Sequence, residues 1–336
     1  MAERKVGTVV SWRTFSPILG VFRLMPEDGA RFPDYKSGQY IALRRDDCKL
    51  TKRVMGEDGK PHYLPDLDES GHHRIGSVAH SYSISSAPFE TREKGYLEFY
   101  IVLEMNDTQF PGRLTESLFR LDPSRDDKVG YVDRIAGDFT LEKRAAGFRS
   151  VLMVGTGTGL APFAAMIKEL DHQAAQGHTD GVRYTLLHAN RTYEELAYHE
   201  ELTDIAAAGR FDFVYVPSVS RPDPRDQADP GLGHGRGNNL LRHFFGMPLK
   251  EEEELKLAAA SGGDVALAQA ALDRAVKPRL PQTLTERELR ERLDPPQTVL
   301  LTCGNPSSMA DIRTAAEANG IRFEKEDWKL VLPARS

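Results

Sequence analysis

Short runs of alternating apolar and polar residues fill the first 145 or so residues of the chain. The first run begins at Val6, and others follow at short intervals with turn-forming residues between them. Strand-like runs separated by turns predict an antiparallel sheet closed into a small barrel. The later runs of this kind are Leu19–Leu24, Tyr40–Leu43, Tyr82–Ser85, Leu97–Leu103 and Val129–Asp133.

The pattern changes after Phe148. A continuous apolar run, Val151–Val154, precedes a glycine-rich turn, a helical stretch and a second apolar run. Strand, helix and strand in this order predict a parallel sheet covered by helices, and Asn319 and Gly320 end the last helix. The remaining elements expected are helices at Ala161–Leu170, Thr192–Ala208 and Met309–Ala318, and strands at Val182–Leu187, Phe211–Val216 and Thr298–Thr302.

Two segments fit neither pattern. Residues 44–79 are polar and aperiodic, which predicts an excursion from the barrel. Residues 221–296 begin with a Pro/Asp/Gly-rich loop and continue into the charged, helix-favouring stretches Leu249–Val276 and Thr283–Leu293. The expected organisation is an antiparallel β-barrel domain over residues 1–147, followed by a parallel α/β domain over residues 148–336 with a helical insertion at about 221–296.

Composition excludes several classes of protein. A chain of 336 residues is longer than one hydrophobic core usually supports, which agrees with two domains. Its apolar runs are too short for a membrane span and its N-terminus lacks a secretory signal, so we expect a cytoplasmic location. We also expect a monomer. Two cysteines, Cys48 and Cys303, cannot hold a four-cysteine iron-sulfur cluster, and no metal site is expected. With 44 basic residues against 50 acidic ones, a global surface for nucleic acid is not expected.

A glycine-rich turn lies between the strand Val151–Val154 and the next helix. Glycine permits positive φ and close backbone approach, and a helix N-terminus offers free N–H groups to a pyrophosphate. The spacing is G-x-G-x-G, one residue shorter than the usual dinucleotide fingerprint, so a tight strand-to-helix connection is the alternative interpretation. The residues of the turn are Gly155, Thr156, Gly157, Thr158 and Gly159.

The segment His80–Ser86 ends a strand with hydroxyl groups around one tyrosine. A flavin requires an aromatic face against its ring and a hydrogen-bond donor near N5, and Tyr82 and Ser83 can supply these. By itself the segment is more typical of an ordinary edge strand rich in serine.

Together the motifs resemble those of the ferredoxin-NADP+ reductase family, most closely the bacterial flavodoxin/ferredoxin reductases. That family has R-x-Y-S, G-x-x-S/T, G-T-G-T/A and C-G-x-P in this order, and here the four stand at His80–Ser83, Gly112–Thr115, Gly155–Thr158 and Cys303–Pro306. The resemblance covers about residues 6–220 and 297–328. It implies a flavoenzyme with an FAD-binding barrel and an NADPH-binding domain.

The resemblance implies specific flavin contacts. Tyr82 would pack on the isoalloxazine, Ser83 would hydrogen-bond near N5, and Thr115 with neighbouring N–H groups would hold the pyrophosphate. The family's arginine is His80 here, and a neutral imidazole does not match a guanidinium, so Arg113 or Arg74 is a candidate replacement and FMN stays open as an alternative to FAD. The candidate flavin-binding residues are His80, Tyr82, Ser83, Gly112, Arg113, Leu114, Thr115 and Trp328.

Near the C-terminus the resemblance implies catalytic groups. Cys303, followed by Gly304, would lie beside nicotinamide C4, the alternative being a small buried residue at a strand end. Trp328 would stack on the flavin, and Glu326 is a candidate proton relay. Because residues 329–336 follow the tryptophan, core packing of Trp328 is the alternative.

Three arginines stand where the resemblance asks for contacts to the 2'-phosphate of NADPH. Two of them, Arg191 and Arg221, come just after predicted parallel strands, where ligands bind in such folds. Arg236, between two glycines, is the third, and Ser220 precedes Arg221. A guanidinium matches phosphate oxygens, so NADPH is expected over NADH, although single arginines are most often solvated surface charges.

The expected reaction is hydride transfer from NADPH to FAD, followed by single-electron steps to a ferredoxin or flavodoxin. The alternatives are a reductase of free flavin, quinone or an oxygenase component, and an electron-delivery subunit of a larger complex. The segment Arg44–Arg53 carries five basic and two acidic residues and is the expected docking site for an acidic redox partner, unless it is simply a solvated loop.

Overall fold

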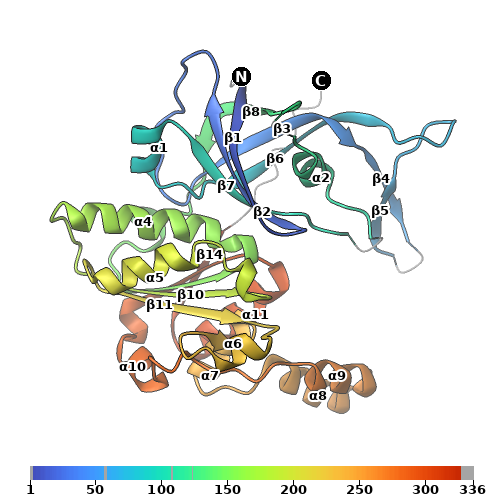
Figure 1. The fold of residues 1–336 in the computed structure, drawn as a ribbon. Coiled ribbons are helices and arrows are strands. Elements are labelled where there is room, and N and C mark those ends of the chain that lie inside the picture. The colour runs from blue at the N-terminus through green and yellow to red at the C-terminus, as the bar shows by residue number, and fades with distance from the viewer. Residues whose placement is uncertain (1–2, 57–58, 107–108, 123, 327–336) are drawn as a thin grey trace. The chain divides into compact units, whose positions relative to one another are not determined.

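The computed structural model describes residues 3–56, 59–106, 109–122 and 124–326. The chain divides into two compact units, the first running to Asp138 and the second beginning at Phe139. Both are shown in Figure 1. Each unit contains one six-stranded sheet, so the expected change from antiparallel to parallel architecture is confirmed.

The first unit is built on an antiparallel half-barrel in the order β6-β3-β8-β1-β2-β7. Strands β3 and β6 pair along most of their length, and Ile41 and Leu43 of β3 face the core with Phe22 and Phe99. Helix α2 (Arg113–Phe119) closes this core with Leu114 and Leu118, both fully buried. The strands are β1 (Arg4–Ser16), β2 (Leu19–Pro26), β3 (Tyr40–Lys49), β6 (Ile75–Ser83), β7 (Leu97–Val102) and β8 (Lys128–Ala136), and a short helix α1 spans Pro88–Lys94.

The excursion expected at 44–79 is an ordered extension of the sheet. Strand β3 continues to Lys49, and β4 (Thr51–Met55) pairs with β5 (Pro61–Pro65) in a separate two-stranded ribbon, visible beside β3 in Figure 1. Its strands were not predicted because both faces of the ribbon are largely exposed, so its residues show no apolar period.

The second unit is a parallel sheet in the order β12-β11-β10-β9-β13-β14. Helices α4 and α5 cover one face and α7, α10 and α11 cover the other (Figure 1). The strands are β9 (Ser150–Thr156), β10 (Arg183–Asn190), β11 (Phe213–Val219), β12 (Gly233–His234), β13 (Thr298–Cys303) and β14 (Arg322–Lys325). The helices are α3 (Leu141–Arg144), α4 (Ala161–Ala175), α5 (His199–Ala208), α6 (Pro224–Ala228), α7 (Gly237–Phe244), α8 (Lys250–Ser261), α9 (Val265–Asp273), α10 (Glu286–Glu291) and α11 (Pro306–Ala318), with 3-10 turns η1 (Gly157–Leu160), η2 (Tyr193–Glu195) and η3 (Pro295–Gln297).

Two sequence expectations in this unit differ from the structure. The helix expected over Thr192–Ala208 begins only at His199, because Tyr198 has a left-handed φ of 63° and separates α5 from η2. Within the segment 221–296, β12 joins the sheet and α7 buries Leu240, Leu241 and Phe244 in its core. The part that lies outside the core is therefore the pair α8 and α9, whose apolar Leu257 and Leu267 are exposed.

Candidate functional site

The carboxyl ends of the parallel strands gather the expected coenzyme residues at one edge of the second unit. Gly155 of β9 pairs with His188 of β10 on one side and with Cys303 of β13 on the other. Strand β11 ends at Val219, in register with Asn190 and His234. Parallel register therefore brings Thr156, Arg191, Ser220, Gly235 and Gly304, which are far apart in sequence, to the same edge.

Two glycines of the glycine-rich turn are required for different structural reasons. Gly157 has a φ of 56°, and a Cβ there would meet nothing within 4 Å. At Gly159 a Cβ would lie 2.1 Å from the Cys303 carbonyl oxygen, so only glycine lets η1 pack against β13. The turn thus lies directly on Cys303–Gly304 and leads into α4, whose first-turn N–H groups are the expected phosphate donors. Thr158 lies between these glycines in η1 and is partly exposed.

Thr156 provides a test of whether a dinucleotide fits this edge. Its Oγ1 is buried and makes no hydrogen bond within the described part of the chain. A Cβ at Gly304, which has a φ of 137°, would lie 2.2 Å from that oxygen, and a Cβ at Gly237 would lie 3.1 Å from the threonine methyl. A buried hydroxyl between two glycines is a cradle that matches a dinucleotide lying across the strand ends.

The structure brings Cys303 and Glu326 together. Both are buried, and the Cys303 thiol donates a hydrogen bond of 2.9 Å to Oε2 of Glu326. Burial, reinforced by the Glu326 carboxylate, raises the pKa of the Cys303 thiol well above its usual range, so the sulfur stays protonated. The pair can hold a proton at the strand end, and the expected Trp328 lies outside the described residues.

The three candidate arginines have unequal surroundings. Arg191 donates from Nε to Oε2 of Glu195 at 2.8 Å and from Nη2 to the other carboxylate oxygen. Arg236 is exposed and lies 3.5 Å from Glu251, a buried carboxylate that Asn239 also contacts. Arg221 is exposed and takes part in no ion pair among the described residues. Its N–H binds the Arg191 carbonyl at 2.8 Å, which places the two arginines side by side.

Sequence reasoning missed two features of this edge. Glu195 lies four residues after Arg191, a spacing that would have suggested an ion pair. A buried polar group connects β10, β11 and α5: the Tyr215 hydroxyl lies 2.9 Å from Nδ1 of His188 and 3.2 Å from Nδ1 of His199. Burial, with a smaller effect of His199, lowers the pKa of His188 to about 3, so this imidazole is neutral. No sequence signal distinguishes it from an apolar strand residue.

In the first unit, the candidate flavin residues line the end of β6. His80 and Tyr82 pair with Leu43 and Ile41 and so share the face that α2 covers. Burial, and then the nearby charge of Arg113, lowers the pKa of His80, so it is neutral and offers no positive charge to a phosphate. Burial also raises the pKa of Tyr82, which stays a phenol and packs against the core. Ser83 is buried at the end of the strand.

The segment before α2 forms a narrow cradle. A Cβ at Gly112 would lie 2.7 Å from Oγ1 of Thr115, so a larger residue would displace that side chain. The Thr115 hydroxyl donates to the Gly112 carbonyl at 3.1 Å. The N–H groups of Arg113, Leu114 and Thr115 lie in the first turn of α2 and have no acceptor within the helix, so they are the expected donors to a phosphate.

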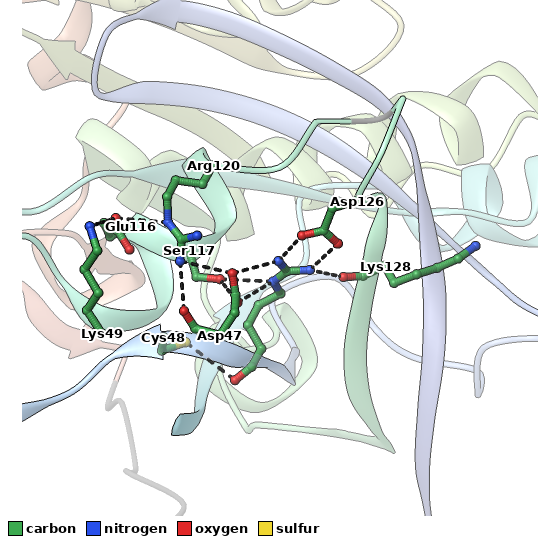
Figure 2. Close-up of polar contacts among 9 residues, drawn as sticks. Asp47, Cys48, Lys49, Glu116, Ser117, Arg120, Asp126 and Lys128 are labelled. Atoms are coloured by element: carbon green, nitrogen blue, oxygen red, sulfur yellow. Dashed lines mark hydrogen bonds and ion pairs between the residues drawn. The ribbon is translucent and has the colours of Figure 1, made fainter. Parts of the chain in front are cut away.

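Figure 2 shows the hydrogen bonds and ion pairs that hold α2 in place. Several of them involve basic residues of the expected docking segment, Arg44–Arg53. Arg45 is only 8% exposed and binds Asp126, Asp47 and Ser117, with 2.9 Å from Nη1 to Oδ1 of Asp126 and 3.0 Å from Nε to the Ser117 hydroxyl. Lys49 binds Glu116 at 2.9 Å.

Arg44 is likewise paired, with Asp46. Of the five basic residues, only Lys52 and Arg53 are exposed and have no ion pair among the described residues. Arg45 and Lys49 belong to a structural ion-pair network with acidic partners on α2 and on the turn before β8, far away in sequence, whereas Arg44 pairs locally with Asp46. Three of the five basic side chains are thus engaged within the protein, and docking of a partner at this segment stays a prediction.

Comparisons with known proteins agree with this architecture. Residues 153–255 match the family model described as the oxidoreductase NAD-binding domain. A flavohemoprotein from Halalkalibacterium halodurans is 27% identical over 209 residues, which are 62% of this chain and 42% of that protein. The chain thus spans less than half the length of this curated relative.

Two solved structures show the same fold across nearly the whole chain. A ferredoxin NADP+ reductase from Neisseria gonorrhoeae with bound FAD and NADP is 19% identical, with a TM-score of 0.56 over 97% of this chain and 99% of that one. The flavohem-like FAD/NAD-binding domain of a nitric oxide dioxygenase from Vibrio cholerae is also 19% identical, with a TM-score of 0.56 over 96% and 98%. The resemblance to ferredoxin-NADP+ reductases is therefore confirmed in the fold, and within the second unit residues 153–255 are similar to the oxidoreductase NAD-binding domain.

Two further observations concern membrane-spanning helices and metal sites. Within the described ranges, no helix is long and apolar enough to cross a membrane. The same residues contain no group of three or more His, Cys, Asp or Glu side chains that could hold a metal ion.

Proposed function

We propose that this protein is a flavin-dependent reductase that takes a hydride from NADPH and delivers single electrons to a one-electron carrier such as ferredoxin or flavodoxin. The observation that carries the proposal is the coenzyme edge of the second unit, where the Gly155–Gly159 turn, Thr156, the Cys303–Glu326 pair and Arg221 meet. This edge lies in a chain with the two-sheet fold of FAD- and NADP-bound reductases.

The flavin contacts of the first unit are part of the proposal. FAD, when bound, accepts two electrons as a hydride and releases them singly. Tyr82 offers its ring, Ser83 its hydroxyl, and the cradle at Gly112–Thr115 its backbone N–H groups to the diphosphate. Because His80 is neutral, Arg113 is the residue of this cluster that can provide positive charge near the phosphates.

The chain's own residues perform the remaining steps at the coenzyme edge. The N–H groups of η1 and the start of α4 hold the coenzyme pyrophosphate, while Thr156 and Gly304 admit the nicotinamide side of the molecule. Cys303 remains a neutral thiol buried beneath this edge, and Glu326 accepts the hydrogen bond of that thiol. Arg221, which follows the end of β11, binds the 2'-phosphate through its guanidinium.

The identity of the electron acceptor has a second candidate. Similar proteins include a flavohemoprotein, of which the match covers only part, and the ferredoxin reductase in carbazole 1,9a-dioxygenase. These names favour a haem domain or an oxygenase component as alternatives to ferredoxin or flavodoxin. The expected cytoplasmic location and monomeric state stay predictions.

One experiment tests the core of the proposal. The purified protein, reconstituted with FAD, is titrated anaerobically with NADPH and with NADH while its absorption spectrum is recorded. We expect one flavin per chain and bleaching at lower NADPH than NADH concentrations. A protein that acquires no flavin absorbance after FAD addition contradicts the proposal.

A panel of acceptors then separates the candidates. Turnover is compared with ferredoxin, flavodoxin, a haem protein, free flavin and quinone at two salt concentrations. Docking of a charged protein through exposed Lys52 and Arg53 predicts a rate that falls with salt, because screening weakens attraction between exposed charges. Turnover with a neutral small acceptor should change much less.

A further inference from the structure

Arg191 and Glu195 form a bidentate ion pair at the coenzyme edge. Both oxygens of the carboxylate accept hydrogen bonds from the guanidinium, which uses its Nε and Nη2 groups. Such a bidentate pair fixes the plane and direction of an arginine far better than a single contact does. Arg191 is therefore not a freely moving surface arginine.

The two partners are buried to different degrees. The Glu195 side chain is 6% exposed and the Arg191 side chain 36% exposed. The surrounding backbone is also fixed, because the Asn190 amide donates to the Glu195 carbonyl at 2.7 Å and the Arg221 N–H binds the Arg191 carbonyl. The buried Glu195 carboxylate is thus a fixed negative charge beside Arg191 at the end of β10.

The negative charge of Glu195 is unfavourable for a 2'-phosphate, which requires positive charge around it. A phosphate dianion near the ends of β10 and β11 is attracted by Arg191 and Arg221 and repelled by Glu195. The charges of Arg191 and Glu195 nearly cancel, so the pair as a whole attracts a bound phosphate only weakly. Arg221 is exposed and has no acidic partner among the described residues, so it is the cation that remains.

We propose that Glu195 is a specificity-determining, positioning residue: it holds Arg191 beside Arg221 and cancels its charge, so that selection of a 2'-phosphorylated coenzyme depends on Arg221 and is moderate. The inference rests on the proposed function only in assuming that the adenosine end of the coenzyme binds at the ends of β10 and β11. It predicts that removing the charge of Glu195 sharpens the preference for NADPH over NADH.

Fragments of the coenzyme test this without any redox step. Binding of 2',5'-ADP and of 5'-AMP to the full chain is measured by calorimetry, since their difference reports the 2'-phosphate alone. For Glu195→Gln we expect 2',5'-ADP to bind about threefold to tenfold more tightly while 5'-AMP stays within about twofold. Glu194→Gln is the matched control, because Glu194 is 59% exposed and lies 3.9 Å from Arg225, so its ratio should stay that of the wild type.

A second variant keeps the test decisive if Glu195→Gln alone fails to fold. The double variant Arg191→Gln/Glu195→Gln removes a pair that we infer to be neutral, and its amides can hydrogen-bond each other. Its affinity for 2',5'-ADP should stay within about threefold of the wild type, whereas Arg221→Gln should lose about tenfold or more.

The outcomes distinguish the inference from the proposed function. An unchanged ratio of the two affinities in Glu195→Gln overturns the inference. So does a double variant that loses as much as Arg221→Gln, because Arg191 would then bind the phosphate directly. Failure of the wild type to bind 5'-AMP at all would instead contradict the proposed coenzyme site.

Discussion

The two candidate sites of this protein are assembled in different ways. At the coenzyme edge, each residue follows a buried parallel strand, and register alone brings Gly155, Cys303 and Asn190 together. The candidate flavin residues lie on one edge strand and one short helix, and a side-chain network from other elements holds these two parts together.

The difference shows in what each site depends on. The coenzyme edge depends on the absence of side chains, since Gly159 and Gly304 allow backbone to approach backbone. The position of α2 depends on the presence of a buried charge, Arg45, and on acidic partners supplied by other parts of the chain. A steric change should therefore damage the second unit most, and a charge change the first.

The largest effect is expected for Gly159→Ala. The new Cβ would lie 2.1 Å from the Cys303 oxygen and 2.6 Å from the Gly304 Cα, and neither backbone group can move without moving β13. We expect the free energy of unfolding to fall by about 4 kcal/mol or more, measured by urea denaturation. Gly157→Ala, where φ is 56° and space is open, should cost only about 1 kcal/mol. Equal losses would show that the turn does not pack as described.

In the first unit, the charge substitution that corresponds to the steric change at Gly159 is Arg45→Gln. It removes a buried guanidinium whose partners Asp126 and Asp47 are 46% and 38% exposed, so water can hydrate these carboxylates, and we expect a loss of about 2 kcal/mol in unfolding free energy and weaker flavin binding. Arg44→Gln is the control, because Arg44 pairs with an Asp46 side chain that is 71% exposed, and it should cost less than about 0.5 kcal/mol. If both variants lost only a little unfolding free energy, the segment Arg44–Arg53 would be better described as a solvated loop.

Arg221→Gln should act on binding and not on stability. Loss of a charge-assisted hydrogen bond should weaken NADPH binding by about 1.5–3 kcal/mol and leave NADH binding unchanged, as measured by titration of the flavin spectrum. Arg225→Gln is the control, since Arg225 covers the Tyr193 ring at 4.5 Å and lies near Glu194. Equal losses for both coenzymes would assign Arg221 to the pyrophosphate or to folding.

His188 should make the second unit sensitive to acid. Its pKa is about 3 in the folded protein and about 6.5 when unfolded, so the unfolded chain binds more protons between these values and stability falls as the pH is lowered through this window. At pH 5 the loss relative to pH 7 should reach about 2 kcal/mol from this group. Denaturation at both pH values should show a shallower dependence in His188→Gln than in the wild type. An identical slope would mean that the folded histidine titrates normally.

The smallest change expected is kinetic. Ser83→Ala should slow reduction of the flavin by NADPH about tenfold, a barrier increase of about 1.4 kcal/mol, because one hydrogen bond near N5 is lost. Stopped-flow absorbance measures this rate. Ser81→Ala, two residues earlier on the same strand and with a hydroxyl that has no partner among the described residues, should stay within about twofold. A variant of Ser83 with the wild-type rate would remove this residue from the proposed mechanism.

The sequence by itself determined the two architectures and most of the coenzyme edge. Parallel strands are continuous apolar runs, and whatever follows such a run lies at the carboxyl edge, so Thr156, Arg221 and Cys303 could be placed from their order alone. The same logic does not show what lies against each residue. Nothing in the alternation of apolar and polar positions indicated that Gly159 touches the Cys303 backbone.

Only the tertiary structure decided which charges are available. Arg45 and Lys49 read as solvated cations in sequence, yet their acidic partners lie 67 to 81 residues further along the chain, and Arg191 is occupied by a buried Glu195. Electrostatic partners are set by distance in space, whereas sequence patterns report distance along the chain and the side of a strand or helix. The pattern could therefore place a residue at an edge of the sheet, and only the packing could determine whether its charge remained free for a ligand.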